Sequence, residues 1–135
     1  MHAYLAIQYH EDHGNRERIE GISAMCEQCG MTTCCIARDV EQWGAFACEP
    51  SARMERSFQE IDASDIVLVD LTEKGVGIGI EAGYAFAKHT PIITIAQADS
   101  SISTTLKGIS QHIFVYSQYV DMAEFLATIK REHTA

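Results

Sequence analysis

Residues 66–96 read IVLVDLTEKGVGIGIEAGYAFAKHTPIITIA, and this stretch decides the fold. It opens with a nearly unbroken apolar run, Ile66 to Asp70, and it closes with a second one, Pro91 to Ala96. Continuous apolar runs of this length are typical of parallel strands that are buried on both faces. Because Gly79 to Lys88 between them has the apolar spacing of a helix, the stretch predicts a strand–helix–strand unit.

The same alternation of apolar runs and helical patterns continues on both sides of this unit. Further strands are expected at residues 3–8, 31–37 and 112–116, and further helices after Asn15, around 54–61, at 104–109 and at 120–131. Strands and helices in strict alternation predict right-handed crossovers and a parallel sheet. We expect one α/β domain over residues 1–135, with a doubly wound, mainly parallel five-stranded sheet, Rossmann- or flavodoxin-like, in a three-layer sandwich. Ligands of such folds bind beyond the carboxyl ends of the strands.

The composition excludes several classes of function. The chain has 135 residues, 47% of them apolar, and a formal net charge of −9, which disfavours binding to polymeric nucleic acid. No stretch approaches the roughly 18 apolar residues of a membrane span. The start, Met1-His2-Ala3-Tyr4, lacks the features of a signal peptide. We expect a cytoplasmic protein without membrane contact.

The cysteines and histidines do not form a metal-binding motif. Cys26-Glu-Gln-Cys29 and Cys34-Cys35 lack the two separated pairs of a zinc ribbon, and Cys26 and Cys29 extend the apolar stripe of a helix. The six histidines form no ligand motif either. We expect no metal and no other cofactor.

The densest polar signal lies between Asp70 and Glu81. Asp70 ends a buried strand, where a carboxylate is costly unless it is solvated, paired or used in chemistry. Gly75, Gly77 and Gly79 follow, and their missing side chains let a ligand approach backbone N–H groups. Taken singly, Asp70 could only form a turn, and Glu81 in the first turn of the expected helix could only complement the helix dipole. Together, at the expected crevice, they favour a functional site, although the spacing matches neither a dinucleotide fingerprint nor a Walker A motif.

The run from 66 to 96 resembles the nucleoside 2-deoxyribosyltransferase superfamily, including its 2′-deoxynucleoside 5′-phosphate N-hydrolase branch. The resemblance is most specific in Gly77-Ile-Gly-Ile-Glu81-Ala-Gly83 and in the acid that precedes it, Asp70. It implies that Glu81 is the nucleophile that attacks the anomeric carbon of the sugar and that Asp70 acts on the departing base, which it could protonate. It also implies a first-strand tyrosine that hydrogen-bonds the nucleophile; Tyr4 is the best match and Tyr9 is the competing candidate.

One departure from the family pattern concerns the substrate. Transferases that act on unphosphorylated nucleosides usually carry an Asp six residues before the nucleophile, and that position is Gly75 here. The absence of this carboxylate removes repulsion against a 5′-phosphate, and Lys74 adds a positive charge beside Gly75. The same change could instead mean that catalysis is lost. Ser103 and Thr104 resemble the phosphate-binding loop of the family, although a helix-capping turn has the same composition. Trp43 could stack on the base or pack on the surface.

These features lead to the hypothesis of an N-glycosidase that cleaves the base from (deoxy)nucleoside 5′-monophosphates through a covalent glutamyl–sugar intermediate. One alternative is a nucleoside 2-deoxyribosyltransferase, which passes the sugar to a second base. Another is a non-catalytic nucleotide-binding module. The expected partner is a small-molecule nucleotide or nucleoside, and the resemblance implies a homodimer or a higher homo-oligomer.

Overall fold

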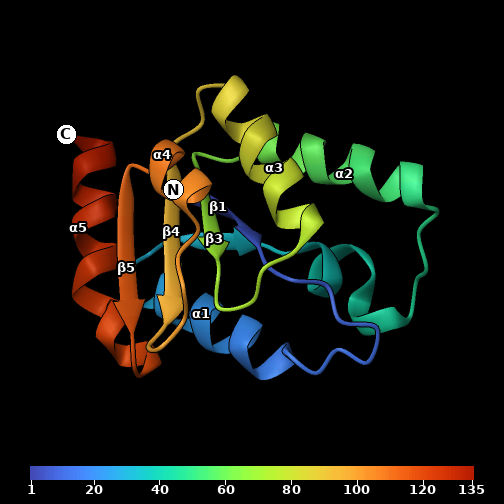
Figure 1. The fold of residues 1–135 in the computed structure, drawn as a ribbon, viewed down its shortest axis with the longest axis horizontal. Coiled ribbons are helices and arrows are strands. Elements are labelled where there is room, and N and C mark those ends of the chain that lie inside the picture. Colours follow the sequence, from blue (N-terminus) through green and yellow to red (C-terminus); the bar gives the residue numbers. More distant parts are fainter.

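A single parallel sheet organises the chain, as a computed structural model of residues 1–135 shows (Figure 1). Its strands are β1 (His2–Ala6), β2 (Thr32–Cys34), β3 (Ile66–Asp70), β4 (Ile92–Gln97) and β5 (His112–Tyr116). They lie in the order β2-β1-β3-β4-β5, and every neighbouring pair is parallel. This architecture confirms the predicted doubly wound, five-stranded α/β fold.

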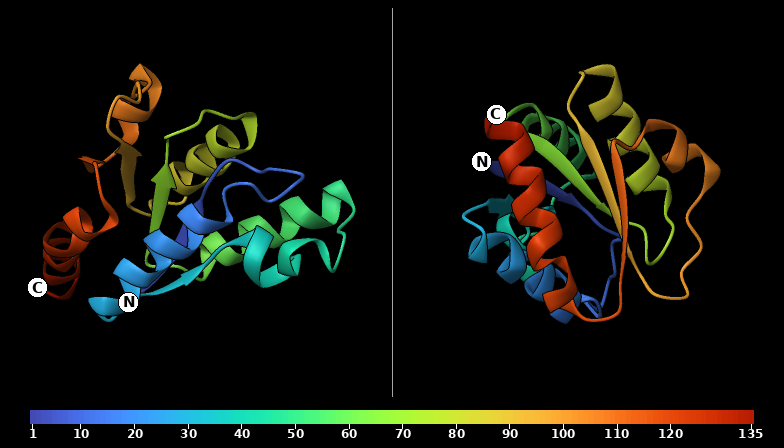
Figure 2. Two further views of the ribbon diagram at one scale, coloured as in Figure 1. Left: turned by 90° about the horizontal axis from the view of Figure 1, so that it is seen from below. Right: turned by 90° about the vertical axis from the view of Figure 1, so that its left-hand side faces the viewer.

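Helices cover both faces of the sheet and complete the three layers. They are α1 (Arg16–Gln28), α2 (Pro50–Asp62), α3 (Val76–Ala87), α4 (Thr104–Ile109) and α5 (Met122–Thr134). Helices α1 and α5 pack on one face, whereas α2, α3 and α4 pack on the other, as Figure 2 shows from below. Each face therefore has its own apolar core. None of the helices combines the length and the apolar character that crossing a membrane requires.

Side chains along the central strands alternate between these two cores. In β1, Leu5 points toward α1 and α5, whereas Tyr4 points toward α2 and α3. In β3, Leu68 points toward α1 and α5, and Val69 points toward α2 and α3. This alternation follows from the two-residue repeat of an extended chain. It predicts that Asp70, two residues after Leu68, points toward α1 and α5.

The connections after β1 and β3 leave the sheet in opposite directions. The chain after β1 continues into α1 on one face, and the chain after β3 continues into α3 on the other. The order of the strands reverses between these two neighbours. In open α/β sheets such a reversal leaves a crevice beyond the carboxyl ends of the strands, which is where ligands bind.

The start of α3 differs from the expected one. The helix begins at Val76 rather than at Gly79, so Gly77 and Gly79 lie within it instead of in a preceding turn. Glu81 is then the sixth helical residue and lies in the second turn. The prediction of a first-turn acid was wrong, because the glycines weaken the helical pattern of the first turn without preventing the helix. A favourable interaction with the helix dipole therefore does not explain the position of Glu81.

Short helical turns that the sequence pattern did not predict connect some of these elements. The segment after β2 forms a π-helical turn at Ile36–Val40 and a 3-10 turn at Gln42–Gly44. A second 3-10 turn, Tyr119–Asp121, leads into α5. Asn15 stands at the position before α1, but its side chain makes no helix cap. Its amide instead donates a hydrogen bond of 2.7 Å to the carbonyl oxygen of Gln8 and so fixes the segment after β1.

Candidate active site

A cavity of about 400 Å³ opens at the crevice where the strand order reverses. Its walls come from β1 and the residues that follow it, from the turn after β2, and from α2 and α3. The lining residues are Tyr4, Leu5, Ile7, Gln8, Tyr9, Cys35, Ile36, Ala37, Arg53, Val76, Gly77, Ile78 and Glu81. Most are apolar, so the few polar groups decide what the cavity can bind.

Glu81 lies in the wall of this cavity and is only 8% exposed. The hydroxyl of Tyr4, which is itself buried, donates a hydrogen bond to Oε2 of the carboxylate. The other carboxylate oxygen, Oε1, accepts no hydrogen bond from the protein. The arrangement orients Glu81 through one oxygen and leaves the second available to a ligand. Of the two tyrosines considered from the sequence, Tyr4 is the one that bonds Glu81.

The electrostatics of the cavity affect the charge of Glu81. Burial raises the pKa of Glu81 to about 7, and the hydrogen bond from Tyr4 and the charge of Arg53 act in the opposite direction. The same environment raises the pKa of Tyr4, through burial first and then through the neighbouring carboxylate. Tyr4 therefore stays protonated and remains a donor. Glu81 changes its charge near neutral pH, a property that is frequent among catalytic acids.

Arg53 is the cavity residue that sequence reasoning missed. It projects from the first turn of α2, and its Nε lies 2.5 Å from Oε1 of the buried Glu41. Its guanidinium carbon lies 4.8 Å from the centre of the Tyr9 ring. The pattern of α2 carried no signal for it, because the face on which it lies shows only in the structure, where Ser57 and Ile61, four and eight residues further along, are both buried. Residues at this spacing share one helix face, which places Arg53 above the buried stripe.

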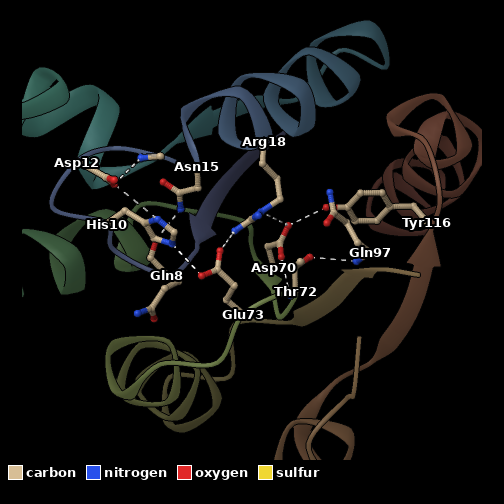
Figure 3. A network of polar contacts seen from close by, with 11 residues as sticks. Gln8, His10, Asp12, Asn15, Arg18, Asp70, Thr72, Glu73, Gln97 and Tyr116 are labelled. Carbon is tan, nitrogen blue, oxygen red and sulfur yellow. Dashed lines mark hydrogen bonds and ion pairs between the residues drawn. The ribbon is translucent and has the colours of Figure 1, made fainter. Parts of the chain in front are cut away.

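Asp70 is not brought into the cavity with Glu81. As the alternation along β3 requires, its side chain points to the other face of the sheet and is fully buried there. It accepts hydrogen bonds from the Tyr116 hydroxyl at 2.9 Å and from the Thr72 backbone N–H at 2.8 Å. Its Oδ2 lies 3.6 Å from Nε of Arg18 on α1. Figure 3 shows these partners converging on the carboxylate.

The partners of Asp70 belong to a larger polar network (Figure 3). Arg18 also donates to Oε1 of Glu73 at 2.6 Å, and Nε2 of His10 lies 2.9 Å from Oε2 of the same carboxylate. Together these contacts lower the pKa of Glu73, first through the hydrogen bond from Arg18. The network ties the segment after β3 to α1 and to the segment after β1. The sequence offered no motif for it, because its members come from separate segments.

The glycines before and within α3 occupy different environments. Gly77 lines the cavity and Gly79 does not, and a Cβ atom added at either would meet open space. Gly75 has extended backbone angles that any residue adopts, so its role is not conformational. A Cβ atom there would overlap the side-chain oxygen of Gln8, another cavity residue. Gly75 thus makes room for Gln8, and Lys74 beside it is exposed.

The remaining candidate residues lie outside the cavity wall. Ser103 accepts a hydrogen bond of 3.3 Å from the Leu106 backbone N–H and caps α4, whose first residue is Thr104. The segment between β4 and α4 folds back along the sheet before the helix begins (Figure 1). Trp43 packs on Arg16, whose guanidinium carbon lies 4.5 Å from the ring centre. In this structure neither the Ser103 segment nor Trp43 faces Glu81.

The fold is nucleoside deoxyribosyltransferase-like, as three solved structures of low sequence identity show. The CMP N-glycosidase BcmB of Clostridium botulinum shares the fold at 20% sequence identity, with a TM-score of 0.64 over 98% of this chain and 99% of that one. The 2-deoxyribosyltransferase of Bacillus psychrosaccharolyticus does so at 12% identity, with a TM-score of 0.70 over 91% and 90% of the two chains. BlsM matches at 18% identity and a TM-score of 0.67, over 97% and 90%. These structures confirm the fold that the sequence resemblance implied.

Comparison with protein-family models and with curated protein sequences gives no match. The likeness to known proteins therefore lies in the fold.

The buried carboxylate predicts a pH-dependent stability. Between the ordinary pKa of 4.5 and about 7, the folded protein binds a proton at Glu81 that the unfolded chain has lost. The free energy of unfolding therefore falls as pH rises through this range. Glu81→Gln removes the charge and should exceed wild type in stability by roughly 2–3 kcal/mol at about pH 8. The two should be nearly equal at about pH 4.5.

Urea unfolding across this pH range measures the difference, with the exposed Glu55 of α2 changed to Gln as the matched control. A gap between Glu81→Gln and wild type that stays constant with pH would contradict the assigned burial cost.

The contact between Gly75 and Gln8 predicts a rearrangement without much loss of stability. In Gly75→Ala the new methyl group overlaps the end of the Gln8 side chain, which is flexible and rotates away. We expect a cost below about 1 kcal/mol. The side-chain amide signals of Gln8 should shift in ¹H–¹⁵N spectra, whereas Gly79→Ala, where a Cβ meets open space, should leave them in place. Unchanged Gln8 signals in Gly75→Ala would refute the contact.

Proposed function

We propose that the protein is an N-glycosidase that releases the base from nucleoside 5′-monophosphates through a covalent intermediate on Glu81. The observation that carries this proposal is a carboxylate buried in the wall of the cavity and oriented by Tyr4, with one oxygen unbonded. A carboxylate in this setting can stabilise a sugar cation and trap it. The cavity of about 400 Å³ has the size of small-molecule sites in proteins.

The reaction proceeds in two steps in this proposal. An oxygen of the Glu81 carboxylate bonds to the anomeric carbon while the bond from that carbon to the base nitrogen breaks. The electron pair of the broken bond leaves with the base. Water then attacks the anomeric carbon, the glutamyl ester opens, and the carboxylate is restored. The hydrogen bond from Tyr4 keeps the carboxylate in one orientation through both steps.

The preference for a 5′-phosphate is supported by the start of α3. Val76 and Gly77, the first two residues of this helix, line the cavity. Unpaired N–H groups at a helix N-terminus attract anions, and the exposed Lys74 precedes them. A phosphate beside this turn would lie near the cavity mouth while the sugar reaches Glu81. In this proposal Gly75 marks the space needed by Gln8 and not a decayed active site.

Activity is tested with a panel of nucleosides and nucleoside 5′-monophosphates, each with and without a second free base. Glu81→Gln should reduce base release by more than about 1,000-fold, because an amide cannot act as the nucleophile. Turnover by wild type should rise with pH through about 7, as Glu81 ionises. Mass spectrometry of enzyme quenched during turnover should find the sugar phosphate on the peptide that contains Glu81.

The outcomes separate the alternatives. Base exchange with a free acceptor base would indicate a transferase instead. Tight nucleotide binding without any product would indicate a binding module. Full activity of Glu81→Gln, with Glu55→Gln as control, would reject the mechanism.

We further propose that a second copy of the chain covers one face of α3. Val76, Ile80 and Phe86 are 82%, 47% and 55% exposed, and a Cβ added at Gly79 or Gly83 would meet open space. An apolar face with small residues can meet its own copy across a two-fold axis. The face adjoins the cavity through Val76. A partner there would also shield the cavity mouth.

Light scattering on a sizing column tests this assembly. Wild type should have the mass of a dimer or larger, and Phe86→Lys should have the mass of one chain. Val120→Lys changes another exposed apolar residue, 61% exposed and remote from α3 in sequence, and should leave the mass unchanged. A single-chain mass for wild type would refute the assembly.

A further inference from the structure

The departing base in the proposed reaction requires a group that stabilises it. When the bond to the anomeric carbon breaks, the base carries away an electron pair and becomes negative unless it is protonated or stabilised. Asp70 points to the opposite face of the sheet and is already bonded by Tyr116 and Thr72. The partner must therefore come from the cavity that holds Glu81.

Arg53 is the only positively charged residue among the thirteen that line the cavity. Its charge also reaches the reacting carboxylate, since it opposes the rise in the pKa of Glu81. Two other ionisable lining residues, Tyr4 and Cys35, have their pKa values raised by burial, so both stay neutral. Arg53 is thus the group on the cavity wall that can offset a developing negative charge.

Two contacts fix the orientation of Arg53. Its Nε donates to Glu41 at 2.5 Å, and the Glu41 side chain is only 8% exposed. Its guanidinium lies over the ring of Tyr9, with 4.8 Å from carbon to ring centre. The side chain itself is 28% exposed and keeps contact with the cavity. The two terminal nitrogens donate no hydrogen bond within the protein, so their N–H groups are free for a ligand.

We propose that Arg53 is a catalytic residue that stabilises the departing base, with Glu41 as its positioning residue; this inference rests on the proposed glycosidase function. Its terminal N–H groups donate to an acceptor atom of the base that is conjugated with the glycosidic nitrogen, such as a ring carbonyl oxygen. As the bond to the sugar breaks, the electron pair spreads onto that acceptor. The base leaves as an anion and then takes a proton from water, and the remaining hydroxide adds to the anomeric carbon and frees Glu81.

The pairing with Glu41 argues for the base rather than the phosphate as the ligand of Arg53. A buried partner carboxylate compensates the charge of the guanidinium, so a dianion gains little at this position. A neutral base, in contrast, is bound through the donors alone, and the attraction grows only as negative charge develops on it. Interactions that strengthen in the transition state accelerate the reaction.

The test uses two substrates that differ in the base. One is the nucleotide that wild type cleaves fastest, and the other is its analogue with an electron-withdrawing substituent on the base, which leaves easily without help. Arg53→Ala should lower kcat on the ordinary nucleotide by about 100- to 1,000-fold, the usual cost of losing one such donor. On the activated analogue the loss should be at least about tenfold smaller. Arg53→Lys, which keeps a charge for Glu41 but loses the planar fork, should show the same discrimination.

Controls guard against misfolding. The double variant Arg53→Ala/Glu41→Gln removes the unpaired buried carboxylate, and its kcat ratio between the two substrates should match that of Arg53→Ala. Arg56→Ala removes the exposed arginine that pairs with Glu60 on the same helix and should change neither substrate.

Three results would each overturn the proposed role of Arg53, and only the third would also overturn the proposed function. Equal losses on both substrates would overturn the role in stabilising the base while leaving glycosidase activity established. Loss of the preference for monophosphates over nucleosides in Arg53→Ala would assign Arg53 to the phosphate and also overturn it. Absence of base release from every substrate by wild type would instead overturn the proposed function itself, and the inference with it.

Discussion

The two-residue alternation of side chains along β1 and β3 is the constraint on which the site depends. It turns Tyr4 toward α2 and α3 and Asp70 toward α1 and α5, although both strands end at the same edge of the sheet. One acid, Glu81, therefore lies in a cavity with few polar neighbours, and the other lies among hydrogen-bond donors. The same edge thus holds two separate polar systems, of which only one faces a cavity.

The network around Asp70 controls geometry more than stability. Arg18 joins Asp70 to Glu73, and its Nε is buried without a hydrogen-bond partner. Buried ion pairs lose much of their attraction to desolvation and contribute little net stability. The ion pairs of Arg18 with Asp70 and Glu73 instead restrict the conformation of residues 71–75, which lead directly into α3. Since Glu81 lies in the second turn of that helix, the network on one face helps to set the position of the carboxylate on the other.

The sequence predicted the parts of this site that depend on local pattern. Apolar runs of strand length revealed the parallel sheet, and the spacing around Glu81 singled out the acid that the structure places in the cavity. The partner of Glu81 could not be chosen from pattern alone, because which face a strand residue meets depends on the helices that cover it. Arg53 was missed for a related reason: α2 carries Arg53 and Arg56, and only packing reveals which one faces the cavity.

The charge of the cavity also differs from that of the whole chain. A net charge of −9 repels an anionic nucleotide at long range, but salt screens this field over about 8–10 Å. Within that distance a nucleotide in the proposed site would meet the N-terminus of α3, and it would meet a Glu81 that is partly protonated near neutral pH. Burial therefore acts twice on the same carboxylate. In the proposed mechanism it would weaken the repulsion that an entering phosphate meets, and it would leave the ionised form poorly solvated and so more reactive toward a sugar cation.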